Sequence, residues 1–145
     1  MELTVLGTSS ALPTSERYPS AHVLEVHERI FLIDCGEGTQ IQLRKNKIRF
    51  SKIDNIFISH LHGDHLFGLY GILSTFNLMG RTAPLNIYAP ERLEEILPRH
   101  LDDFGIKLSF NLEFYSLEGG EMREIYSDKY ITVSAFPLEH RVPTY

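Results

Sequence analysis

The sequence predicts a mixed α and β fold in which layers of β-sheet carry helices on the outside. Segments rich in β-branched and aromatic residues occur towards both ends of the 145-residue chain, and between them apolar strands alternate with helical segments. The composition is 43% hydrophobic and 23% charged, which is enough apolar material for the core of one ordinary domain. No internal repeat and no low-complexity segment divides the chain.

Eight strands are expected, with one long loop near the N-terminus. The strands are predicted over residues 2–7, 22–26, 29–34, 53–59, 85–89, 109–117, 121–127 and 129–138. His27 and Glu28 would form the turn of a hairpin between the second and third of them. The loop over residues 8–21, "TSSALPTSERYPSA", is rich in Ser, Thr and Pro, and long loops of this kind are often functional.

Three helices are expected between the strands. A short one follows "GEGTQ" within residues 36–47, and a longer one over residues 65–80 is apolar on most faces and ends at Gly80 as a C-cap. The third covers residues 90–101 with Pro90 near its start, and Pro98 should end or kink it early.

Several classes of protein are excluded or disfavoured by composition. No apolar run approaches the roughly 20 residues of a membrane span, and the N-terminus lacks the pattern of a secretory signal. The single cysteine, Cys35, cannot form an internal disulfide and suits a reducing cytoplasm. The formal net charge of -5 argues against a protein that coats nucleic acid, although not against a nucleic-acid enzyme.

Residues 59–69, "SHLHGDHLFGL", concentrate His60, His62, Asp64 and His65 in six positions. Imidazole and carboxylate are good ligands for first-row metals, and imidazole suits zinc. The i, i+2 spacing of the first two histidines places both on one side of an extended segment, and the Asp-His pair then begins a helix on a different side. Two such pairs are expected to bind two neighbouring metals. The alternative is a solvated polar turn capped by the aspartate.

These motifs resemble a known family. "SHLHGDH" matches the HxHxDH motif of the metallo-β-lactamase superfamily, and "LGTSSALPTSERYPSA", "DCGEGTQIQL" and "SHLHGDHLFGLYGIL" together resemble the ribonuclease Z family. The resemblance runs from residue 3 to the end of the chain. It implies a metallo-β-lactamase-like αββα sandwich of which residues 1–145 form only the N-terminal half. The chain ends directly after a predicted strand, at "EHRVPTY", which also favours part of a longer protein.

The resemblance also implies a metal centre with two zinc ions. His60 and His62 would bind one ion together with His140, which follows a strand downstream as in the family pattern. Asp64 and His65 would bind the other. The remaining family ligands and the arm that grips tRNA are expected beyond residue 145.

The implied activity is that of a zinc-dependent endoribonuclease that removes the 3′ trailer from tRNA precursors. A metal-bound hydroxide would attack the phosphodiester and leave a 3′-hydroxyl on the tRNA. Asp64 is the candidate catalytic proton acceptor, because it is the only acid in the cluster. Asp34 is expected to accept a hydrogen bond from a ligand histidine, although an ordinary turn residue before Gly36 is the alternative. The resemblance further implies a homodimer. The single cysteine and the lack of a long apolar run favour a cytoplasmic protein without a membrane partner.

One dense basic segment, "LRKNKIRFSK", offers possible RNA contacts. Such residues would hold phosphates without reading sequence, and the alternative is a solvated helix end. The residues are Arg44, Lys45, Lys47, Arg49 and Lys52. The loop over residues 8–21 could likewise line the substrate cleft with hydroxyl groups and Arg17, or be a plain surface loop.

Two other functions remain open. One is another hydrolase of the same fold, such as a phosphodiesterase, arylsulfatase, lactonase or thioesterase. The other is a non-catalytic half-domain or RNA-binding module. As an isolated fragment the chain is expected to be inactive, because its metal site would be short of ligands and one sheet face would be uncovered.

Overall fold

The computed structural model describes residues 1–12 and 14–145, so the part of the predicted loop at Pro13 lies outside the described residues. The strands are β1 (Glu2–Gly7), β2 (Ala21–Val26), β3 (Arg29–Ile33), β4 (Ile53–Phe57), β5 (Leu85–Ala89), β6 (Leu112–Ser116), β7 (Arg123–Ser127) and β8 (Thr132–Ala135). The helices are α1 (Thr39–Lys45), α2 (Gly63–Leu66), α3 (Gly68–Leu78) and α4 (Arg92–Asp103), with a 3₁₀ turn η1 (Phe50–Lys52).

The first six strands form one mixed sheet in the order β1-β2-β3-β4-β5-β6. The pairs β1–β2 and β2–β3 are antiparallel, and β3 to β6 run parallel to one another. The two-residue connection between β2 and β3 has His27 in a left-handed conformation with φ 55°, as the expected hairpin requires. The carboxyl ends of β3, β4 and β5 therefore meet at one edge of the sheet, where ligand sites form in α/β folds.

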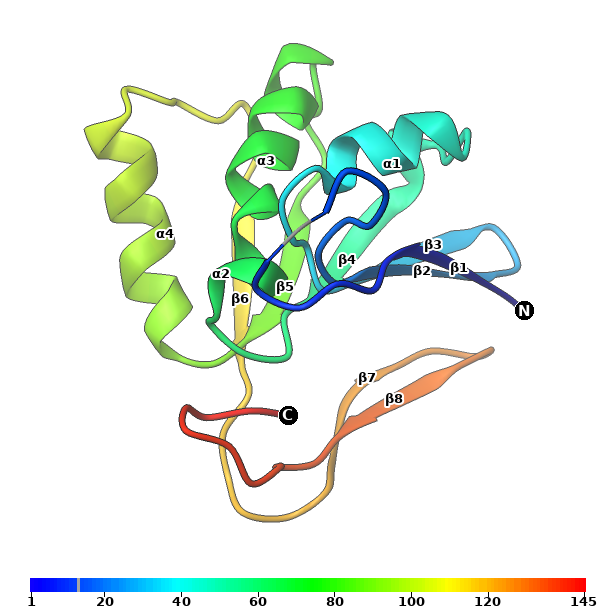
Figure 1. The fold of residues 1–145 in the computed structure, drawn as a ribbon, viewed down its shortest axis with the longest axis vertical. Coiled ribbons are helices and arrows are strands. Elements are labelled where there is room, and N and C mark those ends of the chain that lie inside the picture. Colours follow the sequence, from blue (N-terminus) through cyan, green and yellow to red (C-terminus); the bar gives the residue numbers. More distant parts are fainter. Residues whose placement is uncertain (13) are drawn as a thin grey trace.

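The helices that connect the parallel strands lie together on one face of this sheet (Figure 1). Their apolar side chains fill the main core against the sheet, including Leu43 of α1, Ile72 of α3 and Leu97 of α4, each fully buried. The inward face of the sheet contributes Leu32 and Ile56 to the same cluster. Since parallel strands need such helical crossovers, the order of elements in the sequence largely dictates this layer.

The opposite face of the sheet is covered in part by a separate β7–β8 hairpin (Figure 1). Phe31 and Phe57 of the sheet pack there with Tyr126 and Val133 of the hairpin. The molecule thus has a helical layer, a six-stranded sheet and a two-stranded sheet. The prediction of a mixed α and β fold with layered sheets and outer helices is confirmed.

Two helix predictions need correction. The segment predicted as one helix over residues 65–80 is two helices that meet at Phe67, and its first turn begins earlier, at Gly63. Gly80 does end it, with φ 74°. Pro98 neither ends nor shortens α4, which continues to Asp103.

Pro98 is tolerated because it lies on the exposed side of α4, four residues after the equally exposed Glu94. The backbone carbonyl that loses its helical partner there can be hydrated. The opposite side of α4 is held in the core by the buried stripe of Leu93, Leu97 and Leu101. Tertiary packing therefore outweighs the local effect of the proline. Within the described residues, no helix has both the length and the apolar character needed to cross a bilayer.

Glycines allow three segments to cross closely beneath the carboxyl edge of the sheet. A Cβ on Gly68 would lie 2.0 Å from the carbonyl oxygen of Gly36, and a Cβ on Gly36 would lie 2.3 Å from the carbonyl oxygen of Asp64. The amide of Gly68 also donates to the carbonyl of Cys35 over 2.9 Å. The start of α3 is therefore fixed directly against the loop that follows β3.

Replacing Gly68 by alanine should destabilise the protein. The added methyl group meets backbone that cannot move aside, so we expect the free energy of unfolding to fall by about 1–3 kcal/mol. Urea unfolding followed by circular dichroism measures this change. Gly120→Ala is the matched control, because no atom lies within 4 Å of its Cβ position. Equal stabilities for the two variants would contradict the close crossing.

Candidate metal centre

Three histidines converge at the carboxyl edge of the sheet. His60 and His62 follow β4 in an extended segment, and His140 lies in the loop after β8. One ring nitrogen from each falls within 4.8 Å of the other two. The Nε2 of His60 lies 3.1 Å from the Nδ1 of His62, which lies 3.3 Å from the Nε2 of His140. This set of nitrogens could hold a metal ion.

The loop that carries His140 is held against the start of the histidine segment. The amide of Tyr145 donates to the carbonyl of Ser59 over 3.0 Å, and the amide of Leu138 donates to the carbonyl of Thr144 over 2.9 Å. The loop over residues 138–145 is therefore closed on itself and tied to the end of β4. This connection brings together ligands that are about half the chain apart in sequence.

Ser59 determines how His60 presents its ring. The Oγ of Ser59 lies 3.0 Å from the Nδ1 of His60. With the proton on Nδ1, this nitrogen donates to the hydroxyl, and Nε2 offers its lone pair to the cluster. Burial lowers the pKa of His60, and the neighbouring His65 and His62 lower it as well. The neutral imidazole that metal coordination requires is thus favoured.

Asp64 and His65 form a second pair beside the first. The Oδ2 of Asp64 lies 3.6 Å from the Nε2 of His65, and the rings of His60 and His65 have centroids 4.0 Å apart. The first turn of α2, which begins at Gly63, carries both residues. A carboxylate oxygen and an imidazole nitrogen therefore face each other next to the three-histidine cluster.

Asp34 joins the second pair to the sheet. Its Oδ2 accepts a hydrogen bond from the Nδ1 of His65 over 2.7 Å and one from the Oγ of Ser20 over 3.2 Å, and its Oδ1 accepts one from the amide of Ser59 over 2.9 Å. With the proton held on Nδ1, the Nε2 of His65 is directed at Asp64. The hydrogen bond from a histidine that the sequence predicts for Asp34 is therefore present, whereas metal binding by that histidine stays a prediction.

The pKa values of this pair agree with the geometry. Burial raises the pKa of the Asp34 carboxyl, but the hydrogen bonds from His65 and the Ser59 amide outweigh it, so the pKa lies below its ordinary value. For His65, burial lowers the pKa and the hydrogen bond and charge of Asp34 raise it above its ordinary value. Burial raises the pKa of the neighbouring Cys35 thiol to about 12, which disfavours its thiolate form.

The cluster opens into a cleft of about 670 Å³. Besides the five candidate ligands, it is lined by Ser10, Ala11, Pro19, Glu37, Gly63, Phe67 and Arg141. The loop over residues 8–21 therefore does line the cleft, through its two ends. Arg17 does not, because it borders a separate hollow with Lys45.

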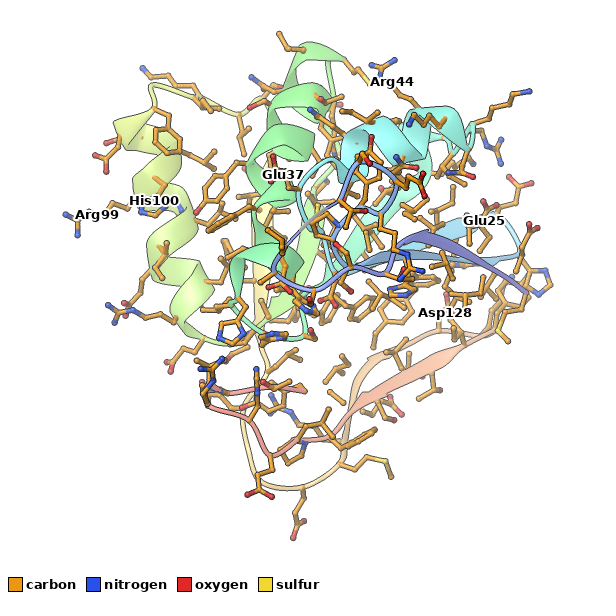
Figure 2. The ribbon with its side chains drawn as sticks, in the orientation of Figure 1. Glu25, Glu37, Arg44, Arg99, His100 and Asp128 are labelled. Carbon is orange, nitrogen blue, oxygen red and sulfur yellow. The ribbon has the colours of Figure 1, made fainter. Side chains whose placement is uncertain are left out.

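The basic segment lies outside this cleft. Arg44 and Lys45 form the last turn of α1, and Figure 2 shows Arg44 beyond α1 on the side of the molecule away from α2. The guanidinium of Arg44 lies over the ring of Phe50, and the ammonium of Lys45 over the ring of Tyr18. Lys52 pairs with Glu28 over 3.4 Å. The structure thus does not bring these side chains to the metal ligands.

Four residues of the site were not predicted from the sequence. Ser20 and Ser59 form hydrogen bonds with Asp34, and Ser59 also contacts His60. Phe67 and Arg141 line the cleft. Arg141 follows a predicted ligand directly, and that position was a usable signal. No pattern in the sequence marks the contacts of Ser20 and Ser59 with Asp34, because that residue lies 14 and 25 positions from them along the chain.

Comparison with known proteins places the chain in a family. The family model described as "Anti-Pycsar protein Apyc1" matches residues 1–139. The chain is 46% identical over 142 residues to ribonuclease Z of Bacteroides fragilis, covering 98% of this chain and 47% of the relative. It is 41% identical to ribonuclease Z of Acaryochloris marina, covering 46% of that protein. The chain spans about half the length of the curated relatives it matches.

Two solved structures resemble the chain along nearly its whole length. Human tRNase Z, short form, superposes with a TM-score of 0.88 at 35% identity, covering 99% of this chain and 61% of that one. The metallo-β-lactamase fold protein YhfI from Bacillus subtilis superposes with a TM-score of 0.70 at 20% identity, covering 99% of this chain and 55% of that one, which supports the fold alone. The resemblance to ribonuclease Z and the metallo-β-lactamase-like fold, both predicted from the motifs, are confirmed.

Replacing Asp34 by asparagine should weaken metal binding. An amide has one acceptor oxygen. Its NH₂ group would face either the Ser59 amide or both the His65 ring and the Ser20 hydroxyl, so the contacts that orient His65 would be disturbed. We expect the affinity for Zn²⁺, measured by competition with a chromogenic chelator, to fall about 10- to 100-fold. Asp102→Asn makes the same change of charge at an exposed position of α4 and should leave the affinity unchanged. Equal affinities in both variants would remove Asp34 from this role.

Proposed function

The chain belongs to the family described as Anti-Pycsar protein Apyc1, and from that premise we propose that it forms the N-terminal half of a metallo-β-lactamase-like hydrolase. The reaction we assign to the whole protein is endonucleolytic removal of the 3′ trailer from precursor tRNA. The convergence of three histidine nitrogens in an open cleft, in a chain 46% identical to a ribonuclease Z, carries this proposal. In this view residues 1–145 are one half of a single domain.

Zinc is the metal we propose, with two ions in the complete centre. Two nitrogens bound tetrahedrally to zinc at ~2.0–2.1 Å lie about 3.3–3.4 Å apart. The separations of 3.1 Å between the ring nitrogens of His60 and His62 and of 3.3 Å between those of His62 and His140 are near this value, and the nitrogens of His60 and His140 lie within 4.8 Å of each other. His60, His62 and His140 would hold one ion, and Asp64 and His65 would contribute to the second.

Bound there, zinc would supply Lewis-acid chemistry, lowering the pKa of a water and withdrawing charge from the scissile phosphate. The side chains then have distinct tasks. Asp64 accepts the proton of the attacking water, since it is the cleft carboxylate next to His65. The guanidinium of Arg141 is available to bind the phosphate. Attack breaks the P–O3′ bond, and O3′ takes up the proton that Asp64 received from the water, which leaves a 3′-hydroxyl on the tRNA and a 5′-phosphate on the trailer.

The partners of the whole protein follow from the same resemblance. We assign it precursor tRNA as substrate, a homodimeric state and a cytoplasmic location, in keeping with its single free and buried cysteine. Arg44, Lys45, Lys47, Arg49 and Lys52 would contact RNA away from the reacting phosphate, because they lie outside the cleft. Sedimentation equilibrium of the full-length protein tests the dimer, and a monomer would contradict it.

A second candidate is another phosphodiesterase of this fold. The family description names Anti-Pycsar protein Apyc1 and not a ribonuclease, so the family match leaves this candidate open. Turnover of a cyclic nucleotide without trailer cleavage would support this candidate over the first.

The main test is cleavage of a trailer-bearing precursor tRNA by the full-length protein. We expect cleavage that a chelator abolishes, and an Asp64→Ala variant whose kcat falls at least about 100-fold, because a proton acceptor and metal ligand is lost. Asp103→Ala, at the exposed end of α4, is the control and should retain full activity. Unchanged cleavage by Asp64→Ala would refute the role of this carboxylate. In the same assay the 145-residue chain alone should be inactive.

A further inference from the structure

Phe67 is an exposed aromatic side chain on the wall of the cleft. It lies at the junction of α2 and α3, two residues after His65, and 65% of it is accessible to solvent. Among the described residues that line the cleft, it is the only large apolar one. Single exposed apolar residues are common on protein surfaces. This one differs because it borders the reactive groups.

The backbone of Phe67 is fixed on both sides. Its amide donates to the carbonyl of Gly63 over 2.9 Å, and the next amide, that of Gly68, donates to the carbonyl of Cys35 over 2.9 Å. A Cβ on Gly63 would lie 2.3 Å from the Cε2 of the ring, so the ring rests against this glycine. The ring is therefore held against Gly63, and most of its surface remains accessible to solvent.

The cleft therefore combines two kinds of surface. The histidines and Arg141 suit a phosphate, and Phe67 offers a flat apolar surface beside them. A nucleotide has the same two parts, an anionic phosphate and an aromatic base. Stacking of a base on an aromatic side chain tolerates any sequence, because every base has a π-face.

We infer that Phe67 stacks on the nucleobase next to the scissile phosphate and so positions a nucleotide substrate for cleavage. The inference rests on the proposed phosphodiester cleavage and adds a specific contact to it. Phe67 is a substrate-positioning residue in this account, and the site requires a nucleotide on at least one side of the bond.

The test compares Phe67→Leu with Phe67→Trp in the full-length protein. Leucine keeps an apolar side chain without a ring, whereas tryptophan keeps the stacking surface. For precursor tRNA we expect KM to rise about 5- to 150-fold for the leucine variant and to stay near the wild-type value for the tryptophan variant. Two further substrates each carry an abasic nucleotide on one side of the scissile bond. For one of these substrates, the KM of the wild type should rise by a similar factor, whereas the KM of the leucine variant should not rise further.

A binding measurement separates this inference from the proposed function. A short RNA that spans the cleavage site, with 2-aminopurine at either flanking position, should lose fluorescence on binding wild type and Phe67→Trp but not Phe67→Leu. That result without trailer cleavage would reject the proposed function and retain the stacking contact. Equal quenching by all three proteins, equal losses on natural and abasic substrates, or a change of oligomeric state in Phe67→Leu would overturn the inference.

Discussion

The buried carboxylate of Asp34 accepts hydrogen bonds from three separate parts of the chain, and the geometry of the candidate metal centre depends on them. The donors are the Ser20 hydroxyl before β2, the Ser59 amide after β4 and the His65 ring on α2. A buried charge left without one of its donors is costly, so the three segments are held together. Asp34 itself has a left-handed backbone with φ 58°, and its amide is fixed to the carbonyl of Phe57 over 2.7 Å.

The hydrogen bonds of Ser59 help to explain how candidate ligands in loops are held in place. The end of β4 carries Ser59, whose hydroxyl lies beside the ring of His60 and whose carbonyl accepts from the loop of His140. The same residue therefore contacts both ends of the ligand set. Gly36 and Gly68, which lack a Cβ, allow the loop after β3 to pack closely against α2, which bears Asp64 and His65, and against the start of α3. The candidate ligands His65 and His140 are thus held by contacts with other parts of the chain, and the ring of His60 by the adjacent Ser59.

Features that depend on neighbouring residues in the chain could be predicted from the sequence. The His27 turn, the Gly80 helix end and the shared side of His60 and His62 follow from local conformation, and the structure has all three. Features set by tertiary contacts were not predictable in the same way. Pro98 remains inside α4 because the helix is buried on its other side, and the break at Phe67 arises where the chain meets the Cys35 loop. The position of His140 was expected only through the family resemblance.

Similarity to ribonuclease Z extends along nearly all of this chain but only about half of each relative, so the chemistry proposed above belongs to the whole protein. Several large hydrophobic side chains on β6 and after β8 remain exposed in this half. Tyr115 of β6 stacks on Tyr88 and remains 46% exposed, and Phe136 and Leu138 beyond β8 are 52% and 53% exposed. We propose that the rest of the domain continues the second sheet next to the β7–β8 hairpin, where it would complete the set of metal ligands.

We propose that His60, His62 and His140 form one zinc site together. Crystallography of the full-length protein with zinc, using anomalous scattering at the zinc edge, is the decisive experiment. We expect an anomalous peak about 2.0–2.1 Å from the Nε2 of His60, the Nδ1 of His62 and the Nε2 of His140. A zinc-loaded crystal whose peaks lie away from these three nitrogens would contradict it.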